Sequence, residues 1–371
     1  MSRSGVGVNR SGWMDLVRQR TERAAEIQYT VRERLGVTNL TEPEALKGVF
    51  ARQGVELPDT RSPTLLRFGV PLAQEIVEWR RLNAFCSDLG PAVSRALDAS
   101  TDGRVHATWE ALGAWTGRMS CRSPALQAVP RDPEVRRLFV PRPGHRIIQA
   151  DYHSCELRIV AQITRDPAMI ALFCDGGDLH RSTAAAMLKK DPKAVTDAER
   201  KLAKPVNFGI SFGMRAEGLV DHAWAEFGIQ MTVEDAAAYR EAFLDKYSGV
   251  ATWHRQMGDE MPSELRSLLG RLIRFPSRAH GLNQRLAGPV QASAADAIKR
   301  ALVLLEPEIE PLGGVIVHVV HDEILVEVSE ATATAARDEV VWAMTTALAE
   351  LTPDIPVVVD SSVRSSWAAE G

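Results

Sequence analysis

The sequence predicts an α+β fold in which a few strands end in acidic residues and helices form most of the remainder. An apolar run over residues 147–150 ends at Asp151 and is followed by a helical pattern. Far downstream, two β-branched runs within residues 315–328 flank Asp322 and Glu323, which indicates a β-hairpin with the acids near its tip. Such distant carboxylates can hold a divalent metal ion if the fold brings them together.

The bulk composition is that of an ordinary globular protein. The chain has 371 residues, of which 45% are hydrophobic and 25% charged, enough for two or three subdomains around a substantial core. It contains no apolar run of the roughly 18 residues that a membrane helix needs, and its N-terminus lacks the apolar segment of a signal peptide. We therefore expect a cytoplasmic protein without membrane contact.

Cysteine spacing and charge narrow the functional classes. The 4 cysteines show no CxxC or Cys/His pattern, which argues against structural zinc and a disulfide framework. A net charge of -4 does not by itself indicate nucleic-acid binding. Cations nevertheless cluster locally, and the alternative interpretation of such clusters is a solvated face. The two groups are Arg131, Arg136, Arg137, Arg142 and Arg146, and Arg266, Arg271, Arg274, Arg278 and Arg285.

Helical periodicity dominates the N-terminal part. Apolar residues recur at helical spacing over residues 17–31, and a capping box headed by Thr41 is expected to begin a second helix. A third helix is expected over residues 72–89, with Gly90 and Pro91 as its stop.

Short strands and then many helices are predicted through the rest of the chain. The strands are expected over residues 105–109, 146–151 and 357–359. The helices are expected over residues 178–188, 197–212, 215–227, 233–247, 291–305 and 332–351.

The helix expected over residues 197–212 concentrates cations on one face. At 3.6 residues per turn, five of its side chains fall within an arc of about 100°. They are Arg200, Lys204, Asn207, Phe208 and Ser211. Two cations beside an aromatic ring suit a triphosphate together with a base or sugar, whereas the structural alternative is an exposed basic stripe. Pro205 lies inside this helix, so we expect either a kink or a later start of the regular turns.

Three stretches, in this order, resemble motifs A, B and C of the family A DNA polymerases, the DNA polymerase I type. Residues 151–158 read DYHSCELR and resemble DYSxxELR, residues 200–209 fit RxxxKxxNFG, and residues 321–323 read HDE. Other segments match in family order. They are TGRMS at 116–120 with Leu126, Gln127 and Pro130 after it, DLH at 178–180, YSGV at 247–250, and Gln291 ahead of AAD at 294–296. One triplet recurs by chance, but seven ordered matches identify the chain as similar to this family.

The resemblance implies a right-hand polymerase fold with an antiparallel-sheet palm, helical fingers and a short helical thumb. Residues 1–100 would form the thumb and an N-terminal helix, 101–165 the first part of the palm, 166–280 the fingers and 281–371 the second part of the palm. The implied function is a template-directed DNA polymerase that adds dNTPs to a primer 3′-end. The expected partners are primer-template DNA and dNTPs, bound by a monomer. Because the chain begins almost at the thumb, we expect no 3′-5′ proofreading.

The resemblance assigns two Mg²⁺ ions, for which Mn²⁺ can substitute, to Asp151, Asp322 and the backbone carbonyl of Tyr152. Such a pair of ions activates the attacking hydroxyl and neutralises the leaving pyrophosphate, and Mg²⁺ favours carboxylate oxygens. Glu323 is expected to support these ligands, and Lys204 to protonate the pyrophosphate.

The resemblance also implies the nucleotide contacts. The expected triphosphate ligands are Arg200, Lys204 and His180. Glu156 would occupy the space of a ribose 2′-hydroxyl and so favour DNA synthesis. Phe208 predicts poor use of dideoxynucleotides. Phe212 stands where the family usually has Tyr, so looser sugar discrimination is expected.

Five residues are expected to contact DNA by the same resemblance. They are Arg118, Gln127, Gln291, His321 and Arg158. An arginine in the minor groove can test for the acceptor atoms that every correct base pair presents there, although a lone loop arginine is more often a surface salt-bridge residue. Ala287 replaces a common Asn, so one contact is expected to be lost.

Three alternatives were weighed against a DNA polymerase. A single-subunit RNA polymerase shares the architecture, but Glu156 and the NFG of residues 207–209 argue against it. A catalytically inactive polymerase-like protein that binds primer-template DNA is disfavoured because both acids and both cations are present. A non-enzymatic helical scaffold explains the periodicity but not the ordered motifs.

Overall fold

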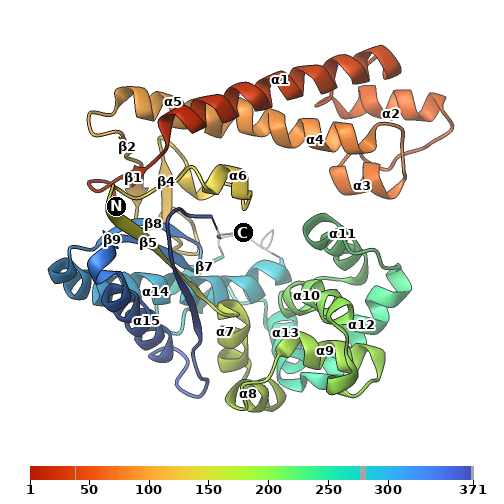
Figure 1. Ribbon diagram of the computed structural model, residues 1–371. Coiled ribbons are helices and arrows are strands. Elements are labelled where there is room, and N and C mark those ends of the chain that lie inside the picture. The colour runs from red at the N-terminus through yellow and green to blue at the C-terminus, as the bar shows by residue number, and fades with distance from the viewer. Residues whose placement is uncertain (38, 276–280, 369–371) are drawn as a thin grey trace. The chain divides into compact units, whose positions relative to one another are not determined.

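The computed structural model describes residues 1–37, 39–275 and 281–368, and the chain forms two compact units (Figure 1). Unit 1 comprises Met1–Trp109, Cys121–Pro143 and Arg364–Gly371. Unit 2 comprises Glu110–Ser120 and Gly144–Val363. Each unit combines segments that are far apart in the sequence, and the four-part division into thumb, palm and fingers stays a prediction.

Unit 1 is mainly helical. Its α-helices are α1 (Arg10–Leu35), α2 (Pro43–Arg52), α3 (Ser62–Arg67), α4 (Ala73–Ala84), α5 (Gly90–Ala99) and α6 (Pro133–Arg136). α1 packs along α4 and α5, and residues such as Ile27, Leu46 and Ile76 form the core between α1, α2 and α4. α1 ends at Leu35, and Gly36 is its C-cap, where a φ of 68° suits glycine.

Two expected helix boundaries in unit 1 are wrong. Gly90 and Pro91 do not stop the third helix, because α4 continues through a π-helical turn, Phe85–Leu89, directly into α5. Pro91 has no N–H to donate, and the π-helical turn directly before it changes the hydrogen-bond pattern, since the Gly90 N–H bonds to the Phe85 carbonyl. Thr41 does not cap α2 either. The N-cap residue is Glu42, which makes no side-chain cap hydrogen bond.

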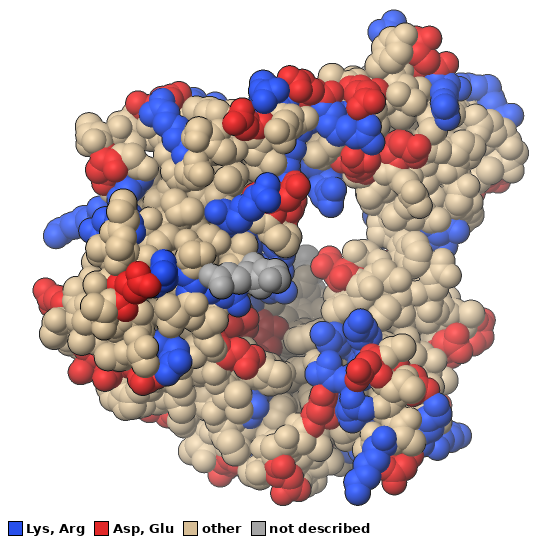
Figure 2. Space-filling model, in the orientation of Figure 1, with Lys and Arg blue, Asp and Glu red and all other residues tan. Residues whose placement is uncertain are grey.

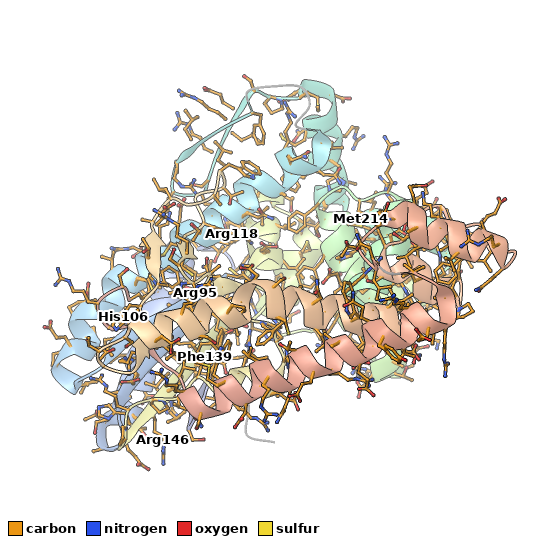
Figure 3. All side chains as sticks on the ribbon, turned by 90° about the horizontal axis from the view of Figure 1, so that it is seen from above. Arg95, His106, Arg118, Phe139, Arg146 and Met214 are labelled. Atoms are coloured by element: carbon orange, nitrogen blue, oxygen red, sulfur yellow. The ribbon has the colours of Figure 1, made fainter. Side chains whose placement is uncertain are left out.

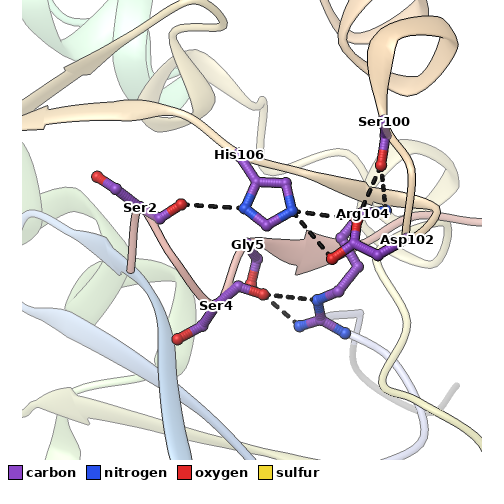
Figure 4. Close-up of polar contacts among 7 residues, drawn as sticks. All are labelled: Ser2, Ser4, Gly5, Ser100, Asp102, Arg104 and His106. Atoms are coloured by element: carbon purple, nitrogen blue, oxygen red, sulfur yellow. Dashed lines mark hydrogen bonds and ion pairs between the residues drawn. The ribbon is translucent and has the colours of Figure 1, made fainter.

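A short strand pair ties the N-terminal residues into unit 1 (Figure 4). The strands are β1 (Val6–Gly7) and β2 (Arg104–Val105). The Arg104 guanidinium donates to the Gly5 carbonyl at 3.0 Å, and the His106 ring bonds to the Ser2 carbonyl at 3.0 Å. The strands β3 (Thr108–Glu110) and β4 (Ser120–Arg122) form a separate two-stranded sheet. The strand expected over residues 105–109 is thus divided between β2 and β3.

Unit 2 is built around a four-stranded sheet in the order β10-β5-β9-β8 (Figure 1). The strands are β5 (His145–Tyr152), β8 (Val315–Val320), β9 (Glu323–Ser329) and β10 (Val359–Arg364). β9 pairs antiparallel with both β5 and β8, which confirms the expected hairpin. The helices α14 (Leu282–Ile309) and α15 (Ala333–Ala349) pack on each other and against the sheet. The C-terminal strand joins this sheet as expected, although it begins two residues later than predicted.

The remaining helices of unit 2 follow β5 in the chain. They are α7 (Cys155–Thr164), α8 (Pro167–Cys174), α9 (Leu179–Leu188), α10 (Asp197–Ser211), α11 (Ala216–Phe227), α12 (Val233–Lys246) and α13 (Ser248–Glu260). Helices α8 and α13 were not predicted, and neither was the hairpin β6 (Glu264–Arg266) with β7 (Leu272–Arg274). The fully buried Asp166 carboxylate links the two helices, because it accepts from the N–H groups of Met169 at 2.9 Å and Gly249 at 2.7 Å. None of the described helices combines the length and apolar composition that crossing a membrane requires.

One face of helix α10 is buried within unit 2, and the opposite face is partly exposed. It begins at Asp197 and includes Pro205, so the expected later start is wrong. Asn207 and Ser211 are fully buried and do not share an exposed face with the cations. The partly exposed members of the expected face are Arg200, Lys204 and Phe208.

Arg271, which lies between β6 and β7, is a partly buried structural link rather than a free surface cation. Its guanidinium donates to the carbonyls of Thr116 at 2.7 Å and Ala292 at 2.9 Å, and it pairs with the Asp296 carboxylate at 2.7 Å. The Asp296 side chain is only 9% exposed. Arg271 therefore neutralises a buried acid on α14 and holds the loop at Thr116.

The next residue of this loop, Gly117, is also in close contact with side chains of unit 2. Its carbonyl accepts from the Lys299 ammonium at 2.5 Å. Its φ is 81°, and an added Cβ would lie 2.3 Å from the Arg271 guanidinium, so a side chain does not fit. These contacts fix the backbone immediately before Arg118, which Figure 3 labels.

We expect Arg271→Ala to destabilise the protein by about 3 kcal/mol, because it leaves the Asp296 carboxylate buried without its counter-ion. Thermal and denaturant unfolding followed by circular dichroism measure the change. Arg274→Ala is the matched control, since Arg274 makes an exposed ion pair with Glu264 and should change stability by less than about 0.5 kcal/mol. Equal losses in the two variants would contradict the assigned role of Arg271.

Candidate active site

The pairing of β5 with β9 brings the acids of motifs A and C to one end of the sheet. Asp151 lies directly opposite Glu323 in the antiparallel ladder. One residue further on, the Tyr152 N–H donates to the Asp322 carbonyl at 3.4 Å. The turn between β8 and β9 contains His321, which is exposed and has a left-handed φ of 55°. Acidic residues from distant parts of the chain thus become neighbours.

Negative charge is concentrated around the first turn of α7. The pKa of the buried Cys155 thiol is raised well above its usual value by burial, and then by the charges of Asp322, Glu156 and Asp151. Burial likewise raises the pKa of Glu156, and Asp322 adds to the rise although Arg118 opposes it. The same acids therefore act on several groups, which places them in one electrostatic site.

This end of the sheet suits a hard divalent cation. Asp151 and Asp322 supply carboxylate oxygens, and Tyr152 ends the strand that carries the first of them. Mg²⁺ is commonly held by one or two carboxylates, while water and substrate phosphates complete its shell. A cation here would offset the field that raises the neighbouring pKa values. Within residues 1–37, 39–275 and 281–368, no three or more His, Cys, Asp or Glu side chains are gathered so that they alone could hold a metal ion.

Glu323 lies next to these acids but is buried. It is 6% exposed, and its carboxylate accepts from the Gln149 side-chain amide at 2.7 Å. Gln149 and Asp151 lie on the same face of β5, because alternate residues of a strand share a face. The position of Glu323 fits a residue that supports Asp151 from inside the sheet.

Arg118 and Glu156 form an ion pair at one edge of the site. The distance between Nη2 of Arg118 and Oε1 of Glu156 is 2.6 Å, and the side chains are 31% and 21% exposed. The loop that carries Arg118 is fixed by Arg271 and Lys299, so the fold presents this guanidinium to Glu156. The residue expected to select the sugar is therefore held by a residue expected to contact DNA.

The cations of α10 lie on the surface of unit 2. Figure 2 shows Lys and Arg side chains gathered over the region of α9 and α10. Arg200 pairs with Asp178, which also accepts the Arg181 N–H at 3.0 Å and so caps α9. Burial alone would raise the pKa of Asp178, but these hydrogen bonds lower it. Asp178 therefore stays charged and holds Arg200, while Lys204 is partly exposed one turn later.

His180 lies beside this surface as a neutral group. It is 8% exposed, and its ring centroid lies 5.9 Å from that of Phe208. Burial lowers the pKa of His180 to about 4. At neutral pH His180 can therefore contribute a hydrogen bond to an anion but not a positive charge.

Arg158, one of the residues expected to contact DNA, is buried and bonded to the protein backbone instead. It is 5% exposed, and its guanidinium donates to the backbone carbonyls of His153, at 2.9 Å, and Pro356. It also stacks over the Phe173 ring at 4.6 Å. Through these contacts Arg158 joins α7 to the segment before β10. The carbonyls also satisfy donors of the guanidinium, which a buried polar group requires.

The other expected site residues occupy separate places. Gln291 is partly buried on α14, and Phe212 is the C-cap residue of α10. Gln127 belongs to unit 1, where it lies in the 3-10 turn Leu126–Ala128. The DNA contacts of Gln127, Gln291 and His321 stay predictions.

The two arginine groups are only partly available as basic patches. Arg271 is a structural link, and Arg285 is 2% exposed. Arg136 stacks on the Trp367 ring at 4.2 Å, and Arg278 lies outside the described residues. Spacing alone did not separate these buried or partly buried arginines from solvated ones.

The sequence pattern did not reveal Asp178 as the partner of Arg200, although an Asp directly before a helix is a strong N-cap signal. It also did not reveal that His180 bonds to Asn207, which bonds to Thr183, or that Thr183 bonds to Tyr247, and no spacing rule connects these residues.

Comparisons with known proteins agree with this geometry. The model of DNA polymerase family A matches residues 15–369. DNA polymerase I of Aquifex aeolicus is 34% identical over 275 residues, which cover 72% of this chain and 47% of that protein. The thermostable DNA polymerase I of Thermus filiformis is 33% identical over 316 residues, covering 81% and 37%. The chain spans less than half the length of these relatives.

A solved structure resembles the whole fold. The POL domain of Pol1 from M. smegmatis, in complex with DNA primer-template and dNTP, superposes with a TM-score of 0.86 at 27% sequence identity. The similarity covers 98% of this chain and 67% of that chain. The predicted polymerase fold is thereby confirmed. Because the family model matches nearly all of a chain whose motif A and motif C acids meet at one sheet end, the chain belongs to DNA polymerase family A.

Proposed function

We propose that the chain is a template-directed DNA polymerase that adds dNTPs to a primer 3′-end. In this reaction the primer 3′-oxygen attacks the α-phosphorus, a phosphodiester bond forms, and the bond to the β-phosphate breaks to release pyrophosphate. The observation that carries the proposal is the β5–β9 ladder, which sets Asp151 beside Asp322 and Glu323. The proposed partners are primer-template DNA and dNTPs, bound by one copy of the chain.

The acids would hold the metal ions. Bound Mg²⁺ or Mn²⁺ would activate the attacking hydroxyl and stabilise the charge on the phosphates, with Asp151, Asp322 and the Tyr152 carbonyl as protein ligands. Glu323 would support this site from its buried position, where Gln149 orients its carboxylate.

The outer face of α10 would bind the triphosphate. Arg200 and Lys204 lie one helical turn apart and offer charge-assisted hydrogen bonds to phosphate oxygens. The Lys204 ammonium would donate a proton to the leaving pyrophosphate. Asp178 keeps the Arg200 guanidinium in place between turnovers.

Glu156 and Arg118 would act on the sugar and the primer. The carboxylate of Glu156 would fill the space that a ribose 2′-hydroxyl requires, and its ion pair with Arg118 restricts where it can move. Arg118, Gln127, Gln291 and His321 are the proposed DNA contacts.

We expect Asp151→Ala and Asp322→Ala each to lower primer extension by about a thousandfold or more, since each removes a metal ligand worth several kcal/mol in the transition state. The assay extends a labelled primer-template with dNTPs and Mg²⁺. Asp338→Ala is the matched control, because Asp338 is an exposed acid of unit 2 that pairs with its neighbour Arg337.

Circular dichroism and fluorescence anisotropy with the same DNA test whether the variants keep their fold and DNA binding. Extension by both Ala variants at the rate of the control would end the metal-ligand assignment. A chain that binds primer-template but does not extend it would instead be the catalytically inactive relative.

We expect Phe212→Tyr to raise the preference for dNTPs over rNTPs several-fold. A tyrosine at this partly buried position restores the hydroxyl that the family usually carries, and that hydroxyl can donate a hydrogen bond to an acceptor such as the Glu156 carboxylate. Single-nucleotide incorporation with dCTP and CTP measures the ratio. Phe68→Tyr in unit 1 is the control, because Phe68 is 43% exposed. An unchanged ratio in Phe212→Tyr would refute the expected role of the hydroxyl.

A further inference from the structure

A row of buried polar side chains lies behind the outer face of α10. Its members are His180 and Thr183 of α9, Asn207 of α10, and Tyr247 between α12 and α13. His180 is 8% exposed and the other three are 0% exposed. Buried polar groups need hydrogen bonds to offset the loss of water, and these four bond to one another in a continuous row.

The atoms in this row determine the direction of each hydrogen bond. Oδ1 of Asn207 can only accept, so the Thr183 hydroxyl donates to it at 2.8 Å. Because the Thr183 proton is then used, the Tyr247 hydroxyl donates to the Thr183 oxygen, 3.0 Å away. Nδ2 of Asn207 can only donate, and it lies 2.8 Å from Nδ1 of His180. Nδ1 therefore accepts, which leaves the proton of a neutral His180 at Nε2.

Burial keeps both ends of the row in the required protonation state. It raises the pKa of Tyr247 to about 12, so the phenol remains a donor at neutral pH. It lowers the pKa of His180 to about 4, so the imidazole remains neutral. The charged and titratable groups that act on the imidazole are Asp178, which raises the pKa, and Arg200, Lys204 and His153, which lower it.

We propose that Tyr247, Thr183 and Asn207 are positioning residues that hold His180 as its Nε2–H tautomer, a neutral hydrogen-bond donor to the phosphates of the incoming nucleotide. The proposal rests on the proposed function, because that function gives His180 its ligand. A neutral donor beside the cations of α10 orients the phosphates through a hydrogen bond. It adds no positive charge that would hold back the departing pyrophosphate.

Asn207→Asp tests the direction of the row with a nearly isosteric change. A carboxylate at this position can only accept, so it draws the imidazole proton to Nδ1 and raises the pKa of His180 toward neutrality. Above that pKa, Nε2 carries no proton, and we expect the KM for dNTP to rise about tenfold while kcat stays within about threefold, as for one lost hydrogen bond to a charged group. Below that pKa, the imidazolium again donates from Nε2, so the KM should return toward the wild-type value.

The measurement is the ratio of variant to wild-type KM between about pH 6 and pH 9, a range that covers the raised pKa of an imidazole paired with a carboxylate. Taking the ratio at each pH removes the titration of the nucleotide itself. A merely structural role for Asn207 would change the KM equally at every pH. A ratio that is independent of pH would therefore overturn the proposal.

Thr183→Val removes the hydroxyl in the middle of the row and should raise the KM in the same direction as Asn207→Asp, without the pH dependence. Thr352→Val is the matched control. Thr352 is also 0% exposed, but its hydroxyl bonds at 2.9 Å to the Leu348 carbonyl at the end of α15. An equal KM change in both threonine variants would assign the effect to general loosening of the fold and contradict the proposed row.

A second readout does not depend on activity. ¹⁵N–¹H correlation spectra of the ring nitrogens, assigned with His180→Gln, report which nitrogen carries the proton. We expect Nε2–H in the wild type and a proton on Nδ1 in Asn207→Asp. Nδ1–H in the wild type would overturn the proposal even if primer extension is normal. An inactive wild type with Nε2–H would instead refute the proposed function and leave the tautomer assignment standing.

Discussion

The antiparallel register of β5 and β9 is the constraint on which the rest of unit 2 depends. It runs from His145 opposite Ser329 to Asp151 opposite Glu323. Ile148 and Val326, which pair within the ladder, are both fully buried. A slip of one residue would turn every side chain of β5 to the other face. The buried apolar pairs therefore fix the register, and the register in turn places the acids.

The acids at this partly buried end of the sheet repel one another, which lowers the stability of the folded protein. The surrounding residues show how the fold offsets this repulsion. The raised pKa values of Cys155 and Glu156 record the local negative field. Arg118 offsets part of this field through its ion pair with Glu156. The loop before Arg118 is fixed to α14 by Arg271, which pairs with the buried Asp296 carboxylate. A bound cation would thus stabilise the protein at this site, because it would relieve the repulsion among the acidic groups.

Helix α10 combines two roles that its spacing alone did not separate. Its partly exposed residues carry the charge, whereas Asn207 and Ser211 face inward. The cation Arg200 is held by an acid that caps the neighbouring helix, and His180 is held by the amide of Asn207. Both groups are therefore oriented before any ligand arrives, which lowers the entropy that binding must offset. Orientation comes from Asp178 at the start of α9 and from the buried Asn207 of α10 rather than from the exposed residues of α10.

The sequence by itself determined most of the longer elements and the order of the acidic and basic motifs. The hairpin at 315–328, the helix after Asp151 and most helices of unit 2 could be predicted, because periodicity and N-cap signals are local properties. Sequence could not show that Gly90 and Pro91 lie within a continuous helix, since no local signal marks the π-helical turn that precedes them and packs against α1. It could not show that Arg158 and Arg285 are buried and that Arg271 pairs with a buried acid while Arg274 is exposed, because arginine spacing carries no information about distant partners. Only the tertiary structure decided these points. It alone placed His180, Asn207, Thr183 and Tyr247 in one row of hydrogen bonds, since hydrogen bonds between separate helices depend on how those helices pack.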